Sequence, residues 1–166
     1  MNIRHSHNHR DDLAGEHPFG DTGQLILLIA FLVVWFIDSF ILRFSTFAVQ
    51  YVSLFLRIPL GALFLFVAGY LAQQGMKAVF GEERTDLAVV EKGVFKRLRH
   101  PVYLGCILFY VGLVMFTLSI SAAVICITII VFYHYIAKHE ERLLLSKFGN
   151  AYERYMKSVP MWIPRL

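Results

Sequence analysis

The chain has 166 residues, of which 57% are hydrophobic, and a formal charge of +4. A soluble domain of this length has too little interior to bury so much apolar surface, which excludes an ordinary soluble domain. The basic residues flank apolar stretches instead of forming one exposed stripe, so membrane headgroups suit them better than nucleic acid. The sequence therefore predicts a single all-α integral membrane domain in contact with the lipid bilayer.

Residues 1–22 are polar and rich in histidine and charge, which predicts a flexible cytosolic tail. A short histidine-rich tract can bind metal, and this remains an alternative for the tail. No cleavable signal peptide is expected, because the first apolar run begins late and lacks a small-residue cleavage pattern. Cys106 and Cys126 lie inside apolar runs without a Cys-x-x-Cys pattern, so we expect neither a disulfide framework nor a zinc site.

The first membrane span is expected at residues 24–42, a stretch long enough to cross a hydrocarbon layer of about 30 Å. It carries Asp38 near its far end, and an acid within a span is by default a candidate functional residue. Arg43 and Arg57 are available at the same interface. Pairing of Asp38 with an arginine is therefore favoured over a functional role.

Pro59 predicts the start of the second span, because proline favours the first turn of a helix. This gives a span over residues 59–74, with residues 44–56 lying along the outer interface. A longer helix kinked at Pro59 is the alternative, and the sequence leaves both open.

The last apolar stretch, residues 102–137, contains no acidic or basic residue except His134. As one helix it would measure about 54 Å at 1.5 Å per residue, which is far beyond one bilayer crossing. A hairpin of two short spans fits better, with its turn near residues 117–121. The prediction is therefore four transmembrane helices within one domain, residues 23–166.

The distribution of basic residues predicts the topology. Four spans place both termini and the hydrophilic loop 75–100 on one side of the membrane. Of the 16 lysines and arginines, only Arg43 and Arg57 fall on the other side. The positive-inside rule makes the first side cytosolic, so we expect a multi-pass protein with both termini in the cytosol. In a prokaryote the membrane would be the plasma or inner membrane.

The same hairpin locates a candidate site at the cytosolic surface. Two acids, Glu140 and Glu141, lie at the cytosolic end of the last span. The antiparallel neighbour contributes Arg99, His100 and Tyr103. Titratable groups that converge on rigid helix ends are typical of a catalytic or binding site. The alternative is an interfacial ion pair that only fixes the hairpin.

A long ordered motif lies at this site: Arg99-His100-Pro101-Val102-Tyr103-Leu104-Gly105, an apolar hairpin, Glu140-Glu141, and then Phe148-Gly149-x-x-Tyr152-x-x-Tyr155. It resembles the isoprenylcysteine carboxyl methyltransferase family and its relatives, the membrane phospholipid N-methyltransferases and small bacterial methyltransferases. The resemblance covers residues 85–164, about half of the chain. The resemblance implies that the protein uses S-adenosylmethionine, but it does not indicate which acceptor is methylated.

The resemblance implies that a helical pocket holds S-adenosylmethionine at the cytosolic face. The matching positions are Leu87, Ala88, Val89, Val90, Phe95, Arg99, His100, Pro101, Val102, Tyr103, Gly105 and Glu140. Leu87 stands where the family has a histidine and Phe95 where it has a tyrosine, so contacts there depend on backbone or ring stacking. Eukaryotic carboxyl methyltransferases have an arginine just before the acidic pair that meets the substrate carboxylate, and its nearest match here is Ile136.

Methyl transfer from a sulfonium to a nucleophile in line depends on close, water-free positioning. A carboxylate or thiolate acceptor needs no base, whereas an amine must first lose a proton, which His139 or Glu141 could take. We expect Lys138, His139, Glu141 and Arg142 to serve the acceptor, and Glu140 to hold a polar or cationic part of the cofactor. The acceptor is expected to be a lipophilic or small molecule that enters from the bilayer.

Three other functions compete with this one. A membrane reductase of the sterol-reductase type would use NADPH; the sequence has no Gly-x-Gly-x-x-Gly, although such enzymes need none. An iron enzyme would need many clustered histidines, and only His100, His134 and His139 lie on the core. A non-catalytic membrane scaffold would differ from all of these by binding no cofactor.

Overall fold

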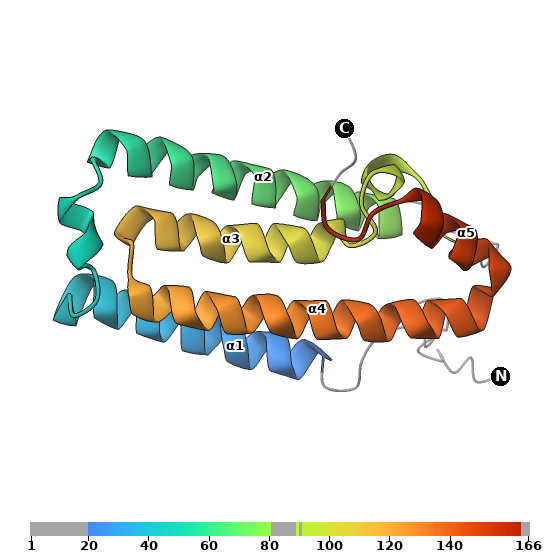
Figure 1. Ribbon diagram of the computed structural model, residues 1–166, viewed down its shortest axis with the longest axis horizontal. Helices are drawn as coiled ribbons and strands as arrows, with labels where there is room; N and C mark the ends of the chain where they lie inside the picture. The colour runs from blue at the N-terminus through green and yellow to red at the C-terminus, as the bar shows by residue number, and fades with distance from the viewer. Residues whose placement is uncertain (1–19, 81–88, 90, 164–166) are drawn as a thin grey trace, which may run out of the picture.

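The computed structural model describes residues 20–80, 89 and 91–163, and within them every regular element is a helix (Figure 1). The predicted tail lies almost wholly outside these residues, as do Leu87, Ala88 and Val90. In chain order the elements are α1 (Gly20–Phe36), the π-helix η2 (Ile37–Leu42), the 3₁₀-helix η3 (Phe47–Gln50), α2 (Leu54–Phe80), the 3₁₀-helix η4 (Gly93–Lys96), α3 (Pro101–Thr117), α4 (Ile120–Phe148) and α5 (Asn150–Ser158).

Three helical stretches, Gly20–Leu42, Leu54–Val79 and Ile120–Phe148, are long and apolar enough to cross a membrane. α3 is also apolar but has 17 residues. In the most apolar part of the first stretch only 11% of the residues are buried by the protein itself, so its side chains need another apolar environment. Helices that are apolar on all sides and not covered by protein are suited to lipid. The protein is therefore an all-α integral membrane protein.

The second span follows the longer of the two predicted alternatives. α2 begins at Leu54 and continues through Pro59 to Phe80, so the expected span over residues 59–74 is too short at both ends. Proline inside a helix removes one backbone hydrogen bond. The start of α2 is fixed from outside, since the Arg57 guanidinium donates to the carbonyls of Val52 (3.1 Å) and Phe116 (2.6 Å).

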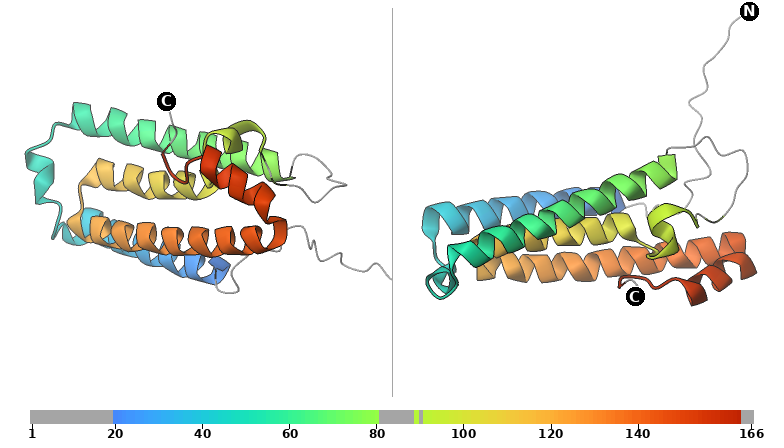
Figure 2. Two further views of the ribbon diagram at one scale, coloured as in Figure 1. Left: turned by 45° about the vertical axis from the view of Figure 1, so that its right-hand side comes forward. Right: turned by 90° about the horizontal axis from the view of Figure 1, so that it is seen from above.

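The helices pack through small residues on one side and a large apolar core on the other. In the bundle, α3 runs beside both α2 and α4 (Figures 1 and 2). α2 and α3 lie side by side; a Cβ atom added at Gly105 would stand 2.9 Å from the Ala68 carbonyl oxygen. At Gly112, one heptad later, it would stand 3.1 Å from the Gly61 carbonyl oxygen. Such small residues let two helix backbones approach closely within a membrane. α4 contacts α3 and α1, and these three helices share the main core.

The hairpin between α3 and α4 turns where the sequence predicts. α3 ends at Thr117, Leu118 adopts a left-handed conformation (φ 49°), and α4 begins at Ile120. The Ser119 hydroxyl accepts a hydrogen bond from the Ala122 backbone N–H at 3.1 Å, which caps α4. The turn thereby sets which residues of the two helices lie opposite each other.

Asp38 pairs with serines, so the predicted arginine pairing is wrong. Its carboxylate accepts hydrogen bonds from the Ser45 backbone N–H at 2.9 Å and from the hydroxyls of Ser45 and Ser119. The Ser45 hydroxyl also accepts from the Ser121 backbone N–H at 2.9 Å. A buried carboxylate can be satisfied by several donors in place of a cation. The cluster ties the end of the first span to the α3–α4 turn.

Replacing Asp38 with alanine is expected to lower the free energy of unfolding by about 2 kcal/mol, because buried donors lose their acceptor. Ser39→Ala is the matched control: the Ser39 hydroxyl is buried without a hydrogen-bond partner in the described part of the chain. Unfolding in mixed micelles, followed by helical circular dichroism, measures both. Equal stability of the two variants would contradict the bracing role of Asp38.

Candidate active site

Arg99 and His100 sit at the entry to α3 on a constrained piece of backbone. His100 occupies the N-cap position and Pro101 the first helical position, where proline is favoured. The Arg99 backbone N–H donates to the Pro160 carbonyl at 3.1 Å, which ties this entry to the chain after α5. Both side chains are therefore presented from a rigid helix end.

α4 brings the paired acids to the same place. Arg99 Nη1 lies 2.6 Å from Glu141 Oε1, and His100 Nε2 lies 3.3 Å from the same oxygen. His100 Nδ1 is 3.7 Å from Glu140 Oε2, and the Tyr103 hydroxyl donates to Glu140 Oε1. The juxtaposition predicted from the hairpin is thus present.

The centre of this cluster is buried but incompletely hydrogen-bonded. The side chains of Arg99 and Glu141 are 10% and 4% exposed. Arg99 Nε and Nη1 and Glu141 Oε2 have no hydrogen-bond partner among the described residues, although Lys138 Nζ lies 3.5 Å from Glu141 Oε2. The short Nη1–Oε1 contact is an ion pair without hydrogen-bond geometry. Buried polar groups of this kind are costly unless a ligand or water satisfies them.

Part of the predicted cofactor motif faces elsewhere. A Cβ atom added at Gly75 of α2 would lie 2.5 Å from Val102 Cγ2 and 3.6 Å from Pro101 Cγ. Gly105 also faces α2, across from Ala68. At about 100° per residue, positions 101, 102 and 105 share the α2 side of α3, whereas Tyr103 points to α4. The structure therefore places Pro101, Val102 and Gly105 in the helix interface, away from the acids.

Two further positions of the motif, Val89 and Phe95, lie against α5. Val89 packs against a small cluster formed by Tyr152, Tyr155 and Val159. The Tyr155 hydroxyl donates to the Phe95 carbonyl at 2.8 Å. Burial raises the pKa of the Tyr152 and Tyr155 phenols, so both stay neutral. The tyrosines hold the segment that leads into α3.

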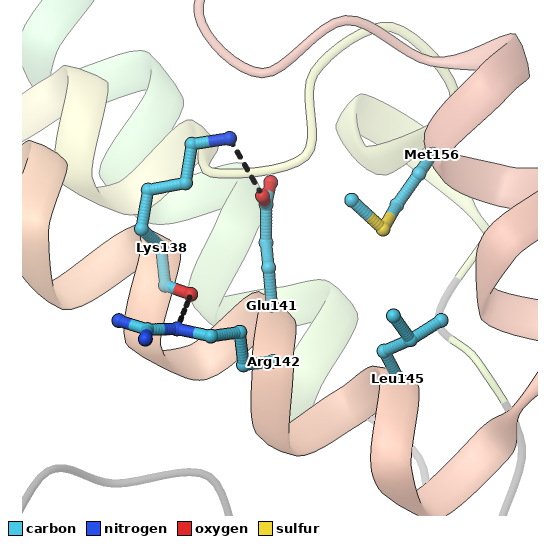
Figure 3. Close-up of a pocket in the computed structure, with 5 residues that line it drawn as sticks. All are labelled: Lys138, Glu141, Arg142, Leu145 and Met156. Carbon is cyan, nitrogen blue, oxygen red and sulfur yellow. Dashed lines mark hydrogen bonds and ion pairs between the residues drawn. The ribbon is translucent and has the colours of Figure 1, made fainter.

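Three of the four residues expected to serve the acceptor line one pocket, and the fourth, His139, does not. Lys138, Glu141 and Arg142 line a pocket of about 340 Å³ together with Leu145 and with Met156 of α5 (Figure 3). Arg142 is held by a hydrogen bond from its Nε to the Lys138 carbonyl at 3.3 Å. His139 is not among the residues that line this pocket. Glu141 alone joins the pocket to the Arg99–His100 cluster.

Sequence reasoning missed one residue at the site, Trp162. Its indole centroid lies 5.8 Å from that of His100, and its N–H donates to His134 Nδ1 at 3.2 Å. Trp162 is far from both histidines in the sequence, and no spacing rule relates them. Only the return of the chain after α5 brings them together.

The helices and the cluster around Arg99 and Glu141 together describe a helical membrane protein with a polar site at one end of its bundle. Residues 56–151, more than half of the chain, match the phospholipid methyltransferase family. The chain belongs to that family, which confirms the predicted resemblance.

Curated relatives carry a more specific name. The chain is similar to protein-S-isoprenylcysteine O-methyltransferases of Schizosaccharomyces pombe (29% identity over 133 residues, 74% of this chain and 56% of the relative). It is also similar to those of Dictyostelium discoideum (28% over 152 residues, 85% and 60%) and Rattus norvegicus (32% over 100 residues, 59% and 35%). The chain spans little more than half the length of the first two relatives. No solved structure matches it.

Proposed function

We propose that this protein transfers a methyl group from S-adenosylmethionine to a lipophilic or small acceptor at the cytosolic face of the membrane. One observation carries the proposal: a buried, under-bonded cluster of Arg99, His100 and Glu141 in a chain of the phospholipid methyltransferase family. The names of the curated relatives support methyl transfer as the reaction.

The chemistry of the donor set fits this cofactor. Its amino-acid end carries a carboxylate and an ammonium group. The Arg99 Nε and Nη1 groups, which have no hydrogen-bond partner among the described residues, suit the carboxylate, and Glu141 Oε2 suits the ammonium. Glu140, which accepts from Tyr103, is left for a polar or cationic part of the same molecule. The parallel rings of His100 and Tyr103, with centroids 5.7 Å apart, offer an apolar face beside these charges.

When bound, the cofactor supplies an electrophilic methyl group on a sulfonium. The chain itself has to orient the acceptor and exclude water, which contributes most of the acceleration in such a transfer. Lys138 and Arg142 line the open pocket and would address an anionic acceptor. For an amine acceptor, Glu141 or His139 would take the proton.

The acceptor is proposed as an amphiphile with a carboxylate, amine or thiol head. An S-prenylated cysteine is one candidate, because the curated relatives are named for it. Ile136, nearest to the family's carboxylate-binding arginine, is buried in the bundle and apolar. Lys138 or Arg142 would therefore have to supply the positive charge, and Lys138 would do so without a bidentate fork.

We propose four spans, with α3 as the short one, and both termini in the cytosol. The charge distribution supports this topology, since Arg43 caps η2 at the end of the first span and Arg57 bonds the Phe116 carbonyl, at the end of α3 opposite to Arg99. A cofactor would then reach the site from the cytosol and a lipophilic acceptor from the bilayer. In a prokaryote the membrane would be the inner membrane.

Binding of radiolabelled S-adenosylmethionine to detergent-purified protein tests the proposal. His100→Ala and Glu140→Ala are each expected to weaken binding about ten- to a hundredfold, because the first removes the ring beside the cofactor and the contact that orients Glu141, and the second removes the carboxylate for a polar or cationic part of it. Glu153→Gln is the matched control, since among residues 20–80, 89 and 91–163 the ion-pair partner of Glu153 is Lys157, on the exposed side of α5. Equal binding by wild type and both site variants would refute the assignment. Retention of NADPH instead would favour the reductase.

A further inference from the structure

The chain after α5 turns back across the bundle and lies beside the candidate site (Figures 1 and 2). This segment, residues 159–163, is fixed at two points. Val159 is buried against Tyr152 and Tyr155, and the Pro160 carbonyl accepts the backbone N–H of Arg99 at 3.1 Å. The position of the next large side chain, Trp162, is thereby coupled to the entry of α3.

Trp162 bridges the polar cluster and the apolar half of α4. Its indole packs against the main core of the bundle, between the rings of His100 (5.8 Å) and His134 (6.2 Å). His134 lies seven residues before Glu141, so both share one face of α4 about 10 Å apart along its axis. Around His134 the helix is uncovered: the side chains of Val131 and Tyr135 are 64% and 55% exposed. The indole therefore stands between the site and the lipid-facing surface.

The contact with Trp162 also determines the tautomer of the His134 ring. An indole N–H can only donate, so His134 Nδ1 must accept at 3.2 Å, and the ring proton sits on Nε2. This Nε2–H has no hydrogen-bond partner within the described part of the chain. An exposed donor on a membrane helix is costly unless a polar group reaches it. An acceptor molecule with a carbonyl or carboxylate head would satisfy it.

We propose that Trp162 and His134 form the acceptor-selecting wall of the site, a proposal that rests on the function proposed above. The indole limits how bulky a chain can lie between His100 and α4, and His134 Nε2–H binds the hydrogen-bond-accepting head. The ligand class is an amphiphile with an apolar chain next to a carboxyl or carbonyl group. Trp162 is thus a specificity-determining residue.

A series of N-acetyl-S-alkylcysteines with geranyl, farnesyl and geranylgeranyl chains tests the wall. Trp162→Ala is expected to shift the ratio of kcat/KM between the longest and the shortest acceptor at least about tenfold towards the longest. Trp162→Phe, which keeps a ring of similar width, should restore the wild-type ratio. Trp35→Phe is the control, because Trp35 bonds the Leu113 carbonyl and the Thr117 hydroxyl at the far end of the bundle. An unchanged ratio in Trp162→Ala overturns the inference.

A second measurement does not depend on turnover. With Trp35→Phe, Trp162 is the only tryptophan, since the chain has two. In vesicles of acyl-chain-brominated phosphatidylcholine, its emission should be quenched relative to unbrominated vesicles, and N-acetyl-S-farnesylcysteine should relieve the quenching. Absence of quenching would show that Trp162 does not border the bilayer, and would overturn the wall.

The two proposals fail in distinguishable ways. If the wild-type protein does not bind S-adenosylmethionine, the proposed function is overturned, whatever the tryptophan emission shows. If the protein binds the cofactor and methylates the acceptors, but Trp162→Ala leaves the ratio of kcat/KM between the longest and the shortest acceptor unchanged, only the proposed role of Trp162 and His134 is overturned. The ratio compares two acceptors at one cofactor site, so a weaker cofactor affinity cancels from it.

Discussion

Replacing Glu141 with methionine is expected to lower the free energy of unfolding by about 3–5 kcal/mol, because a buried cation loses its counter-charge. Glu141 is 4% exposed and lies against Arg99 at 2.6 Å and His100 at 3.3 Å. Methionine keeps most of the volume, so the loss reports charge and not a cavity. Titration with dodecyl sulfate in mixed micelles, followed by helical circular dichroism, gives the free energy.

The double variant Arg99→Met/Glu141→Met separates charge from packing. Removing both charges of a buried pair is often neutral, so the double variant should regain most of the stability lost by Glu141→Met. Glu153→Gln, on the exposed side of α5, should change stability little. Strict additivity of the Arg99→Met and Glu141→Met effects would show that the two side chains are not coupled.

Replacing Gly105 with leucine is expected to destabilise the bundle by about 3 kcal/mol, because the new side chain meets backbone. A Cβ atom there would stand 2.9 Å from the Ala68 carbonyl oxygen and 3.3 Å from the Ala72 nitrogen. Neither atom belongs to a flexible side chain that could move aside, so α2 and α3 must separate. Thermal unfolding in detergent measures the loss.

Gly69 supplies the control for this substitution. It lies on α2, one residue after Ala68, yet a Cβ atom there would meet nothing within 4 Å. Gly69→Leu should leave stability unchanged or raise it by up to about 1 kcal/mol, since leucine is the better helix former. Similar losses at both positions would mean that the close approach of α2 and α3 does not limit stability.

Local sequence signals were sufficient for the hairpin and for the residues it brings together. A single apolar run too long for one crossing requires a turn, and the turn at Leu118 and Ser119 falls within the predicted stretch. Once the turn is placed, antiparallel packing puts Glu141 opposite Arg99. Register in such a hairpin depends only on counting residues from the bend.

Contacts between residues far apart in the sequence could not be predicted from local patterns. Asp38 is satisfied by Ser119, which is 81 residues away, and the sequence offered two nearer arginines as plausible partners. Pro59 is compatible with a helix start or with a longer helix, because proline favours the first turn, and the contacts of Arg57 with Val52 and Phe116 accompany the longer form, in which α2 begins at Leu54. In both cases tertiary contacts outweighed the local preference.

The membrane environment, the helical class and the meeting of the Arg99–His100 corner with the paired glutamates could be predicted from the amino-acid order. These follow from apolar run lengths and from the geometry of one bend, which are local properties. Packing across the bundle settled which face of α3 turns towards α2 and which towards α4. It also decided that the chain after α5 returns to set Trp162 between His100 and His134, because that return depends on packing between segments far apart in the chain.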